Sequence, residues 1–206
     1  MADSKQVIAI LTSIGEKICT EKDYLTDLDR PIGDSDHGIN LARGFTAVAE
    51  KLPTLEDKDI GTILKSVGMT LVSTVGGASG PLYGTAFMRA GAMIGDKQEI
   101  DISDFVNLMI AATEGVKMRG HATVGEATMI DAMVPAVEAM QTANGKTAKE
   151  VLDAGVKAAW EGAAYTKGLV ATKGRASYVG ERGIGHQDPG ATSFSFILEV
   201  IARSFA

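Results

Sequence analysis

The sequence predicts an all-α protein, a barrel or bundle of eight antiparallel helices that forms a single domain over residues 1–206. Three observations lead to this prediction. Apolar residues recur at helical spacing along most of the chain, few segments show the alternation that strands need, and the links between the expected helices are short. No repeat, low-complexity tract or proline-rich linker marks a boundary between domains.

The first half of the chain is expected to form four helices. Residues 4–19 carry apolar side chains at helical spacing, and residues 37–51 repeat the pattern. Residues 54–57 resemble a capping box that opens a third helix, which should stop at residues 76–77 because glycine suits the position after a helix. Proline suits a first helical turn, so a fourth helix is expected over residues 81–94.

The second half is expected to add four more helices. Three of them begin at side chains typical of N-caps, which accept hydrogen bonds from the first free amides of a helix. The first of the four runs from a cap at Asp101 or Ser103 to Arg119, and the second covers residues 126–142 with a kink expected at Pro135. The third begins at the capping box of residues 147–150 and continues past Tyr165, and the fourth runs from Asp188 through residues 194–201.

Composition limits the classes of protein that the chain fits. It has 206 residues, of which 45% are hydrophobic, and a formal net charge of −6. No run of lysine and arginine is present, so a nucleic-acid surface is not expected. The single cysteine, Cys19, falls in an apolar-periodic stretch and is expected to be buried. Without a leader peptide or 18 consecutive uncharged apolar residues, the chain is expected to be cytoplasmic and to contact no membrane.

Glycine is concentrated in four stretches that interrupt the helical pattern, residues 29–38, 76–81, 119–128 and 173–190. One interpretation is ordinary turns, because glycine adopts positive φ angles readily. The other is that several helix ends meet at one anionic ligand, since the free amides of a helix start bind anions.

Three carboxylates lie within the first of these stretches. Asp29, Asp34 and Asp36 offer hard oxygen ligands, which suit Mg²⁺ or Ca²⁺ better than Zn²⁺. The alternative, an aspartate that only caps a helix beginning at His37, explains one of the three. We therefore expect a divalent-cation site. His37 is either an exposed turn residue or a partner of the carboxylates, and Asn40 should face the same side.

Two later stretches carry features of a phosphate site. Residues 76–81 place glycines before a helix, although a plain link between helices explains them equally well. Residues 120–128 have the glycine spacing of a P-loop, but Glu126 replaces the lysine, so a P-loop is rejected. Arg175 either clamps phosphate oxygens or pairs with a helix end or with Glu181, in a loop long enough to act as a lid.

The longest unusual strings, residues 28–40, 68–84 and 173–193, resemble one family. Over essentially its whole length, the chain is similar to the nucleotide-binding L subunits of phosphotransferase-system-dependent dihydroxyacetone kinases. It is similar also to the C-terminal nucleotide domains of single-chain, ATP-dependent dihydroxyacetone kinases. The resemblance implies an all-α barrel of eight antiparallel helices with the nucleotide site at one end.

The resemblance also implies the ligands of this site. Asp29, Asp34 and Asp36 would bind two Mg²⁺ ions that bridge the phosphates of tightly bound ADP. Ser79 would lie against the phosphates, and Met129 would help to form the adenine pocket. The residues implied to contact ADP are His37, Gly38, Ile39, Asn40, Ala78, Ser79, Gly120, Met129, Arg175, Asp188, Pro189 and Gly190.

By the same resemblance, the chain is a subunit of a phosphoenolpyruvate–glycerone phosphotransferase that is active only with partner subunits. A phosphocarrier subunit would phosphorylate ADP in place, and the group would pass to dihydroxyacetone on a separate K subunit. No residue of this chain is then expected to accept the group. With 206 residues, the chain has no room for the substrate domain of a single-chain kinase. The alternatives are a subunit that exchanges bound nucleotide with ATP and a nucleotide-sensing regulator.

Overall fold

The computed structural model describes residues 1–143 and 145–205 and confirms the all-α prediction. Within these residues the chain forms nine α-helices and one pair of two-residue strands. The helices are α1 (Ser4–Thr20), α2 (Lys22–Asp29), α3 (His37–Lys51), α4 (Ile60–Thr74), α5 (Ser79–Ile94), α6 (Ile102–Gly120), α7 (Ile130–Thr142), α8 (Ala148–Tyr165) and α9 (Pro189–Arg203). The 3₁₀ turns are η1 (Leu52–Leu55), η2 (Thr166–Gly168), η3 (Arg175–Tyr178) and η4 (Gly180–Gly183), and the antiparallel strands are β1 (Ala2–Asp3) and β2 (Glu99–Ile100).

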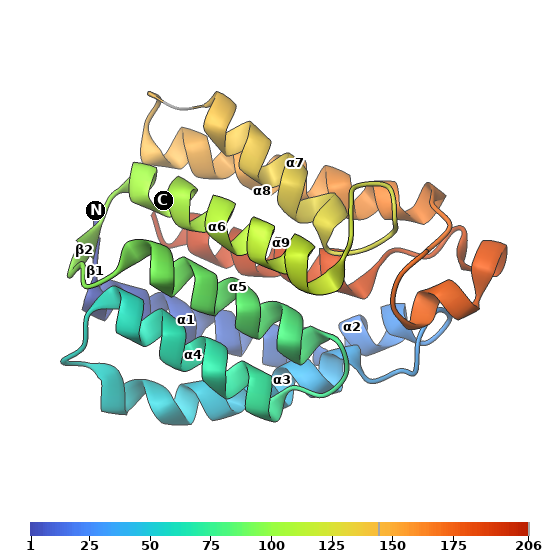
Figure 1. Ribbon diagram of the computed structural model, residues 1–206, viewed down its shortest axis with the longest axis horizontal. Helices are drawn as coiled ribbons and strands as arrows, with labels where there is room; N and C mark the ends of the chain where they lie inside the picture. Colours follow the sequence, from blue (N-terminus) through green and yellow to red (C-terminus); the bar gives the residue numbers. More distant parts are fainter. Residues whose placement is uncertain (144, 206) are drawn as a thin grey trace.

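Eight of these helices form a closed ring. From α3 to α9, each helix packs against the next one in the chain, α1 packs against α3, and α9 returns to pack against α1. Neighbouring helices run antiparallel, and the start of α1, the end of α9 and the strand pair lie at one end of the ring (Figure 1). The predicted eight-helix barrel is therefore confirmed.

The ninth helix, α2, is absent from the sequence prediction. It packs outside the ring against α3 and α9. Only Leu25 and Asp29 are buried among its eight residues, so its apolar periodicity is too weak to predict a helix. As a result, Asp29 is the last residue of a helix. The prediction that it lies in a loop is wrong.

Helix starts agree with the predicted caps in most cases. Of the two caps proposed for α6, Asp101 is the one used, and it forms a capping box with Asp104. The capping box predicted at Thr147 begins α8. The capping box predicted at residues 54–57 is wrong, because these residues overlap the η1 turn and α4 begins after them. The cap of α4 is Asp59, whose Oδ1 accepts the amide hydrogen of Thr62 at 2.7 Å.

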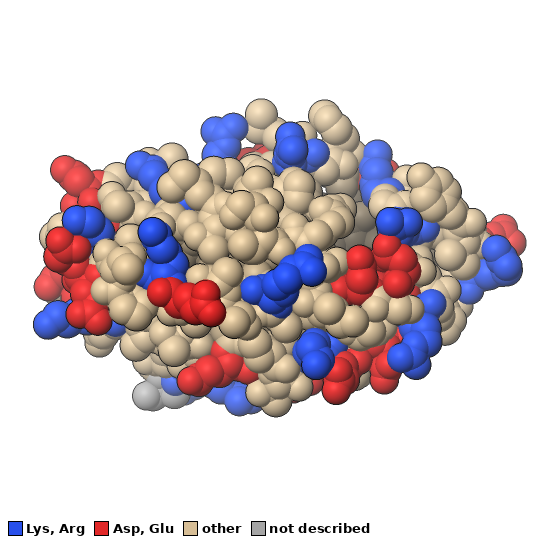
Figure 2. Space-filling view, turned by 90° about the horizontal axis from the view of Figure 1, so that it is seen from below, with Lys and Arg blue, Asp and Glu red and all other residues tan. Residues whose placement is uncertain are grey.

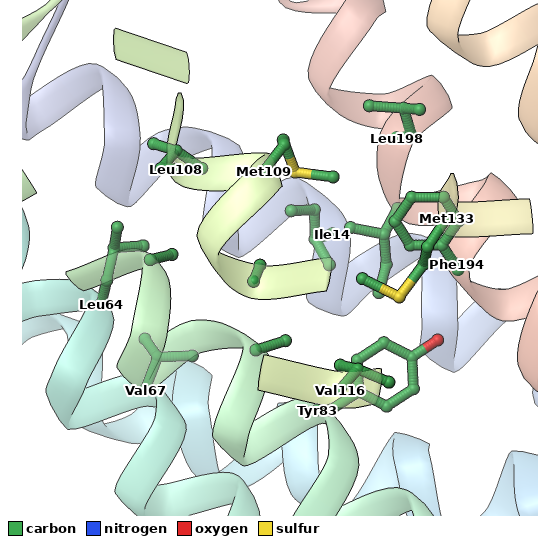
Figure 3. Close-up of a cluster of buried hydrophobic side chains, with 14 of the residues drawn as sticks. Ile14, Leu64, Val67, Tyr83, Leu108, Met109, Val116, Met133, Phe194 and Leu198 are labelled. Carbon is green, nitrogen blue, oxygen red and sulfur yellow. The ribbon is translucent and has the colours of Figure 1, made fainter. Parts of the chain in front are cut away.

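Apolar side chains from all around the ring fill its interior. Ile14 of α1, Val67 of α4, Met133 of α7 and Phe194 of α9 are buried in one cluster (Figure 3). Burial of each such side chain contributes roughly 1.5–3 kcal/mol relative to exposure. The ring is thus held by contacts between helices that are distant in sequence, which fixes where the loops at its ends lie.

Helices α4 and α5 approach each other closely because glycines line their contact. A Cβ atom at Gly61 would lie 1.9 Å from the carbonyl oxygen of Gly95, and one at Gly68 would lie 2.7 Å from that of Gly84. Side chains at these positions would force the helices apart. The close pairing sets the position of the loop that joins α4 to α5.

The surface carries charges of both signs. On the face that Figure 2 draws, Lys and Arg side chains are interspersed with Asp and Glu, and uncharged residues cover much of the rest. Cys19 is exposed, so its predicted burial is wrong; it lies beside the stripe formed by Leu11, Ile14 and Ile18, one residue beyond the buried face of α1. Among the described residues, no helix is both long and apolar enough to span a membrane.

Candidate functional site

Four helices begin at one cavity, at the end of the ring opposite the strand pair (Figure 1). The cavity has a volume of about 310 Å³. It is lined by the first residues of α3, α5, α7 and α9, which are His37, Ser79, Ile130 and Pro189. The start of a helix carries a partial positive charge and free amide groups. The predicted convergence of helix ends therefore occurs, and it produces a pocket suited to an anion.

The start of α5 forms the glycine-rich wall of the pocket. Gly76, Gly77 and Ala78 line the cavity, and Gly77 has a φ angle of +66°, which glycine adopts at little cost. Ala78 occupies the N-cap position and provides no side-chain hydrogen bond to the first turn. The first amides of α5 are therefore available to a ligand. This arrangement favours the predicted phosphate-binding role over a plain link between helices.

The three predicted metal ligands come together at the rim of the pocket. Asp29, Asp34 and Asp36 each offer an oxygen atom, and these atoms lie within 4.8 Å of one another. Asp29 is buried, and its Oδ2 accepts the amide hydrogens of Asp36 at 2.9 Å and His37 at 3.3 Å. The end of α2 thus fixes the loop that carries the other two carboxylates.

Electrostatics at the cluster favour a cation. Partial burial raises the pKa of Asp36, and the negative charges of Asp34 and Asp29 raise it further, against the hydrogen bond from Asn40. The Nε atom of Arg175 lies 2.6 Å from Oδ2 of Asp34. The pairing expected for Arg175 with a helix end or Glu181 is therefore wrong, and the guanidinium stands at the carboxylate cluster.

Substitution of Gly33 should disrupt metal binding without unfolding the protein. A Cβ atom there would lie 1.9 Å from Oδ1 of Asp29, so the carboxylate must rotate away. Mg²⁺ demands near-ideal ligand geometry, so Gly33→Ala is expected to weaken Mg²⁺ binding at this candidate site by at least about tenfold in calorimetry. The control is Gly183→Ala, whose Cβ would meet only Ile32 at 3.6 Å. Equal affinities of the two variants would contradict the prediction.

His37 is buried, so the interpretation of an exposed turn residue is wrong. Burial lowers its pKa to about 4, although the charge of Asp29 opposes this shift. Its Nδ1 lies 3.1 Å from the hydroxyl of Ser79 and its Nε2 lies 3.0 Å from that of Ser193. The main-chain amide of His37 contacts the carboxylate of Asp29, whereas its ring contacts two serines.

A second buried carboxylate, besides that of Asp29, shapes the opposite wall. Asp131 is fully buried, and its two oxygens accept the amide hydrogens of Gly125 at 2.5 Å and Thr128 at 2.8 Å. These bonds hold residues 125–128 as a loop, so α7 begins at Ile130 and the predicted start at residue 126 is wrong. Asp131 is not recognisable as a site residue from the sequence, because an acidic residue is ordinary in the first turn of a helix.

The same loop is tied to the segment that carries Arg175. Glu126 accepts hydrogen bonds from the amide of Thr123 at 2.7 Å and the hydroxyl of Thr172 at 2.7 Å. Its carboxylate also lies 3.6 Å from the ammonium of Lys173, which lines the pocket. Glu126, which occupies the position of a P-loop lysine, thus connects two walls of the site.

Asp188 caps α9 at the pocket wall, where its Oδ2 accepts the amide hydrogen of Ala191 at 2.6 Å. Removal of the carboxyl group from water raises its pKa to about 7, and the charges of Asp131 and Asp29 contribute to this rise. The folded protein then keeps this proton up to about pH 7, whereas the unfolded chain loses it near pH 4.

The folded protein binds the proton of Asp188 more tightly than the unfolded chain, and this difference stabilises the fold at low pH. The free energy of unfolding in EDTA should therefore fall as the pH rises from about 4 to 7. Asp188→Asn keeps the cap and is expected to be roughly 2 kcal/mol more stable than the parent protein at pH 8 in urea titrations. Asp59→Asn is the contrasting control, because hydrogen bonds from Thr62 lower the pKa of Asp59. It should lose stability at pH 8. Parallel pH profiles for Asp188→Asn and the parent protein would contradict this assignment.

The cavity brings together most of the predicted site residues. Those that line it are Asp29, Asp34, Asp36, His37, Ala78, Ser79, Gly120, Met129, Arg175, Asp188, Pro189 and Gly190. Gly38, Ile39 and Asn40 do not line it. Gly38 packs against α2, Ile39 is half-exposed, and Asn40 accepts a hydrogen bond from Arg43 at 2.7 Å beside Gly76. Four residues that were not predicted also line the cavity: Tyr83, Arg119, Thr128 and Lys173.

Comparison with known proteins shows close relatives along nearly the whole chain. The family model of the DAK2 domain matches residues 31–203. The chain is 47% identical over 199 residues to the ADP-binding subunit DhaL of the PEP-dependent dihydroxyacetone kinase of Escherichia coli, covering 96% of this chain and 95% of that protein. It is 44% identical over 196 residues to the ADP-binding subunit DhaL of the PTS-dependent dihydroxyacetone kinase of Lactococcus lactis, covering 95% of each.

Larger kinases share the fold over part of their length. The native crystal structure of the dihydroxyacetone kinase of C. freundii matches with a TM-score of 0.76 and 25% identity, over 99% of this chain and 35% of that chain. The L-erythrulose 1-kinase of Mycolicibacterium smegmatis is 29% identical over 203 residues, which cover 97% of this chain and 35% of that protein. In both comparisons, this chain corresponds to about a third of a longer protein.

Proposed function

The chain belongs to the DAK2 domain family, and from this premise we propose that it is the ADP-binding subunit of a phosphoenolpyruvate-dependent dihydroxyacetone kinase. The relatives that match it from end to end carry this name, whereas the longer kinases contain about two thirds of additional sequence. In the proposed system, a K subunit presents dihydroxyacetone and a phosphocarrier subunit delivers the phosphoryl group.

The donor set of the pocket fits Mg²⁺ and a nucleotide diphosphate. Asp29, Asp34 and Asp36 provide three oxygen ligands within one cluster, which suits two Mg²⁺ ions at the rim. The cavity of about 310 Å³ falls within the range of roughly 300–1,000 Å³ of small-molecule sites. Four helix starts favour negative charge within it. These features support ADP with its phosphates beside the aspartates.

Each wall of the pocket then has a role. The first amides of α5 and the hydroxyl of Ser79 donate hydrogen bonds to phosphate oxygens. Arg175 stands beside Asp34 and offers a cation within reach of the same cluster. Met129 is buried, and its thioether provides a polarisable surface for adenine. Arg119 adds a second guanidinium at the wall.

When bound, ADP would supply the acceptor for the phosphoryl group of the phosphocarrier and, as ATP, the donor to a hydroxyl of dihydroxyacetone on the K subunit, which regenerates ADP. The residues of this chain contribute by holding the reacting groups in place and by offsetting negative charge, which are the main sources of catalysis in phosphoryl transfer. In this mechanism, no nucleophilic side chain of the protein accepts the phosphoryl group.

One observation carries the proposal: a carboxylate cluster and four helix starts meet at one cavity. The test is the nucleotide content of the purified protein. Denatured protein should release close to equimolar ADP, as measured by mass spectrometry. The same preparation, mixed with a K subunit, a phosphocarrier system and phosphoenolpyruvate, should phosphorylate dihydroxyacetone. Transfer by protein that holds no nucleotide would overturn the proposal.

The same mixture separates the two alternatives. A subunit that exchanges its nucleotide should replace bound ADP by labelled ATP within one turnover and should work without the phosphocarrier. A nucleotide sensor should retain ADP but phosphorylate nothing in the complete mixture. Retention of unlabelled ADP during repeated turnover supports a resident cofactor.

A further inference from the structure

A buried chain of hydrogen-bonding side chains connects the core to the phosphate wall of the pocket. The hydroxyl of Ser79 lies 3.1 Å from Nδ1 of His37, and Nε2 of His37 lies 3.0 Å from the hydroxyl of Ser193. The hydroxyl of Tyr83 lies 2.6 Å from that of Ser193. The Tyr83 ring is part of the core cluster, with its oxygen at the edge of the cluster (Figure 3).

The hydrogen bonds that link these four side chains can run in either of two directions. A neutral imidazole has one N–H group and one lone pair, so its two nitrogens have opposite roles. If Nε2 of His37 carries the hydrogen, Ser79 donates to Nδ1 and turns lone pairs toward the pocket. If Nδ1 carries it, Tyr83 donates to Ser193, Ser193 to Nε2 and Nδ1 to Ser79. The hydroxyl hydrogen of Ser79 is then free to point into the pocket.

A phosphate in the pocket selects the second direction. Phosphate oxygens accept hydrogen bonds, so they are repelled by a Ser79 lone pair and attracted by its O–H group. The first direction also needs an acceptor for Ser193, and the carbonyl oxygen of Gly190 lies 3.1 Å from its hydroxyl. Without a ligand, the protein can therefore adopt either direction of hydrogen bonding. An anion beside Ser79 determines which direction is populated.

We infer that His37 is a positioning residue: in the nucleotide complex its ring carries the hydrogen on Nδ1, and the chain from Tyr83 through Ser193 directs the Ser79 hydroxyl at a phosphate oxygen. This inference rests on the proposed function, because it needs a nucleotide phosphate at Ser79. It assigns the His37 ring an action through Ser79, in place of the direct ADP contact expected from the sequence.

A double-mutant cycle tests the inference through Mg²⁺-ADP affinity. Ser79→Ala should weaken binding by about tenfold to a hundredfold, because a hydrogen bond to a charged group is lost. Ser193→Ala should weaken it by about threefold to tenfold in the parent protein and have no effect when Ser79 is already alanine. The same penalty in both backgrounds would show an effect that does not pass through Ser79, and would overturn the inference.

Two further comparisons separate positioning from structural damage. Ser195 is a buried serine of α9 whose hydroxyl donates to the carbonyl of Ala191 at 2.9 Å. It takes no part in the hydrogen bonds that link Tyr83 to Ser79. Ser195→Ala should leave the affinity for ADP unchanged. His37→Asn places an amide near the position of Nδ1 and should keep more affinity than His37→Gln, which reaches the position of Nε2. The reverse order would contradict the assigned role.

Nitrogen-15 NMR of the histidine rings gives a direct readout. The protein has three histidines, and His37→Asn identifies the signals of His37. With Mg²⁺ and ADP bound, Nδ1 should carry the hydrogen and Nε2 should not. ADP binding with the hydrogen on Nε2 would overturn the inference alone. Failure of the parent protein to bind ADP would overturn the proposed function and this inference with it.

Discussion

Asp34→Ala is expected to abolish retention of ADP by the purified protein. Asp34 is one of three carboxylates whose oxygens lie within 4.8 Å of one another, and its removal takes away one of the three oxygen ligands of the proposed Mg²⁺ site. Mg²⁺-dependent ADP affinity should fall by more than about a hundredfold in calorimetry. Arg175, released from its contact with Asp34, provides a single charge and cannot replace a divalent cation.

The fold should survive this change. The ion pair between Asp34 and Arg175 is solvent-exposed, and such pairs contribute about 0–1 kcal/mol to stability. The control is Asp27→Ala, which removes another exposed aspartate that pairs with an arginine, Arg30, at 2.8 Å. It should keep its ADP. Normal nucleotide content in Asp34→Ala, measured by mass spectrometry after denaturation, would reject the metal site.

Asp131→Ala is expected to destabilise the protein by about 2–4 kcal/mol. The substitution removes a buried carboxylate and leaves the amides of Gly125 and Thr128 without their acceptor. Unsatisfied buried donors cost the full penalty of their desolvation. Because residues 127–129 line the cavity, ADP affinity of the folded variant should fall as well. Urea unfolding and calorimetry measure the two effects.

Two companion variants make this result specific. Asp153→Ala removes an exposed carboxylate of α8 that pairs with Lys149, and its stability should change by less than about 0.5 kcal/mol. Asp131→Asn keeps one acceptor oxygen but places an amide group against an amide hydrogen, so its loss should be intermediate. In addition, the pKa of Asp188 should fall in Asp131→Ala, because a nearby negative charge is gone. Unchanged stability of Asp131→Ala would contradict the assigned role.

The pattern of the chain predicted the ring well and predicted its connections less well. Helical periodicity identified the eight helices of the ring because each buries an apolar stripe. It missed α2, which buries little, and it placed the start of α4 too early at residues 54–57. It also extended α7 back to residue 126. The preceding residues form a loop because they are held by the side chain of Asp131, which belongs to α7 itself.

The sequence by itself determined the chemistry available to this protein. Three aspartates within eight residues indicate a divalent cation, and glycines before helix starts indicate an anion, because these properties depend on residue type and short spacing. What only the tertiary structure decided is which side chains support that chemistry. His37 and Ser193 are separated by 156 positions and meet because α3 and α9 start at the same cavity. Local spacing carries no record of such a contact, since closure of the ring creates it.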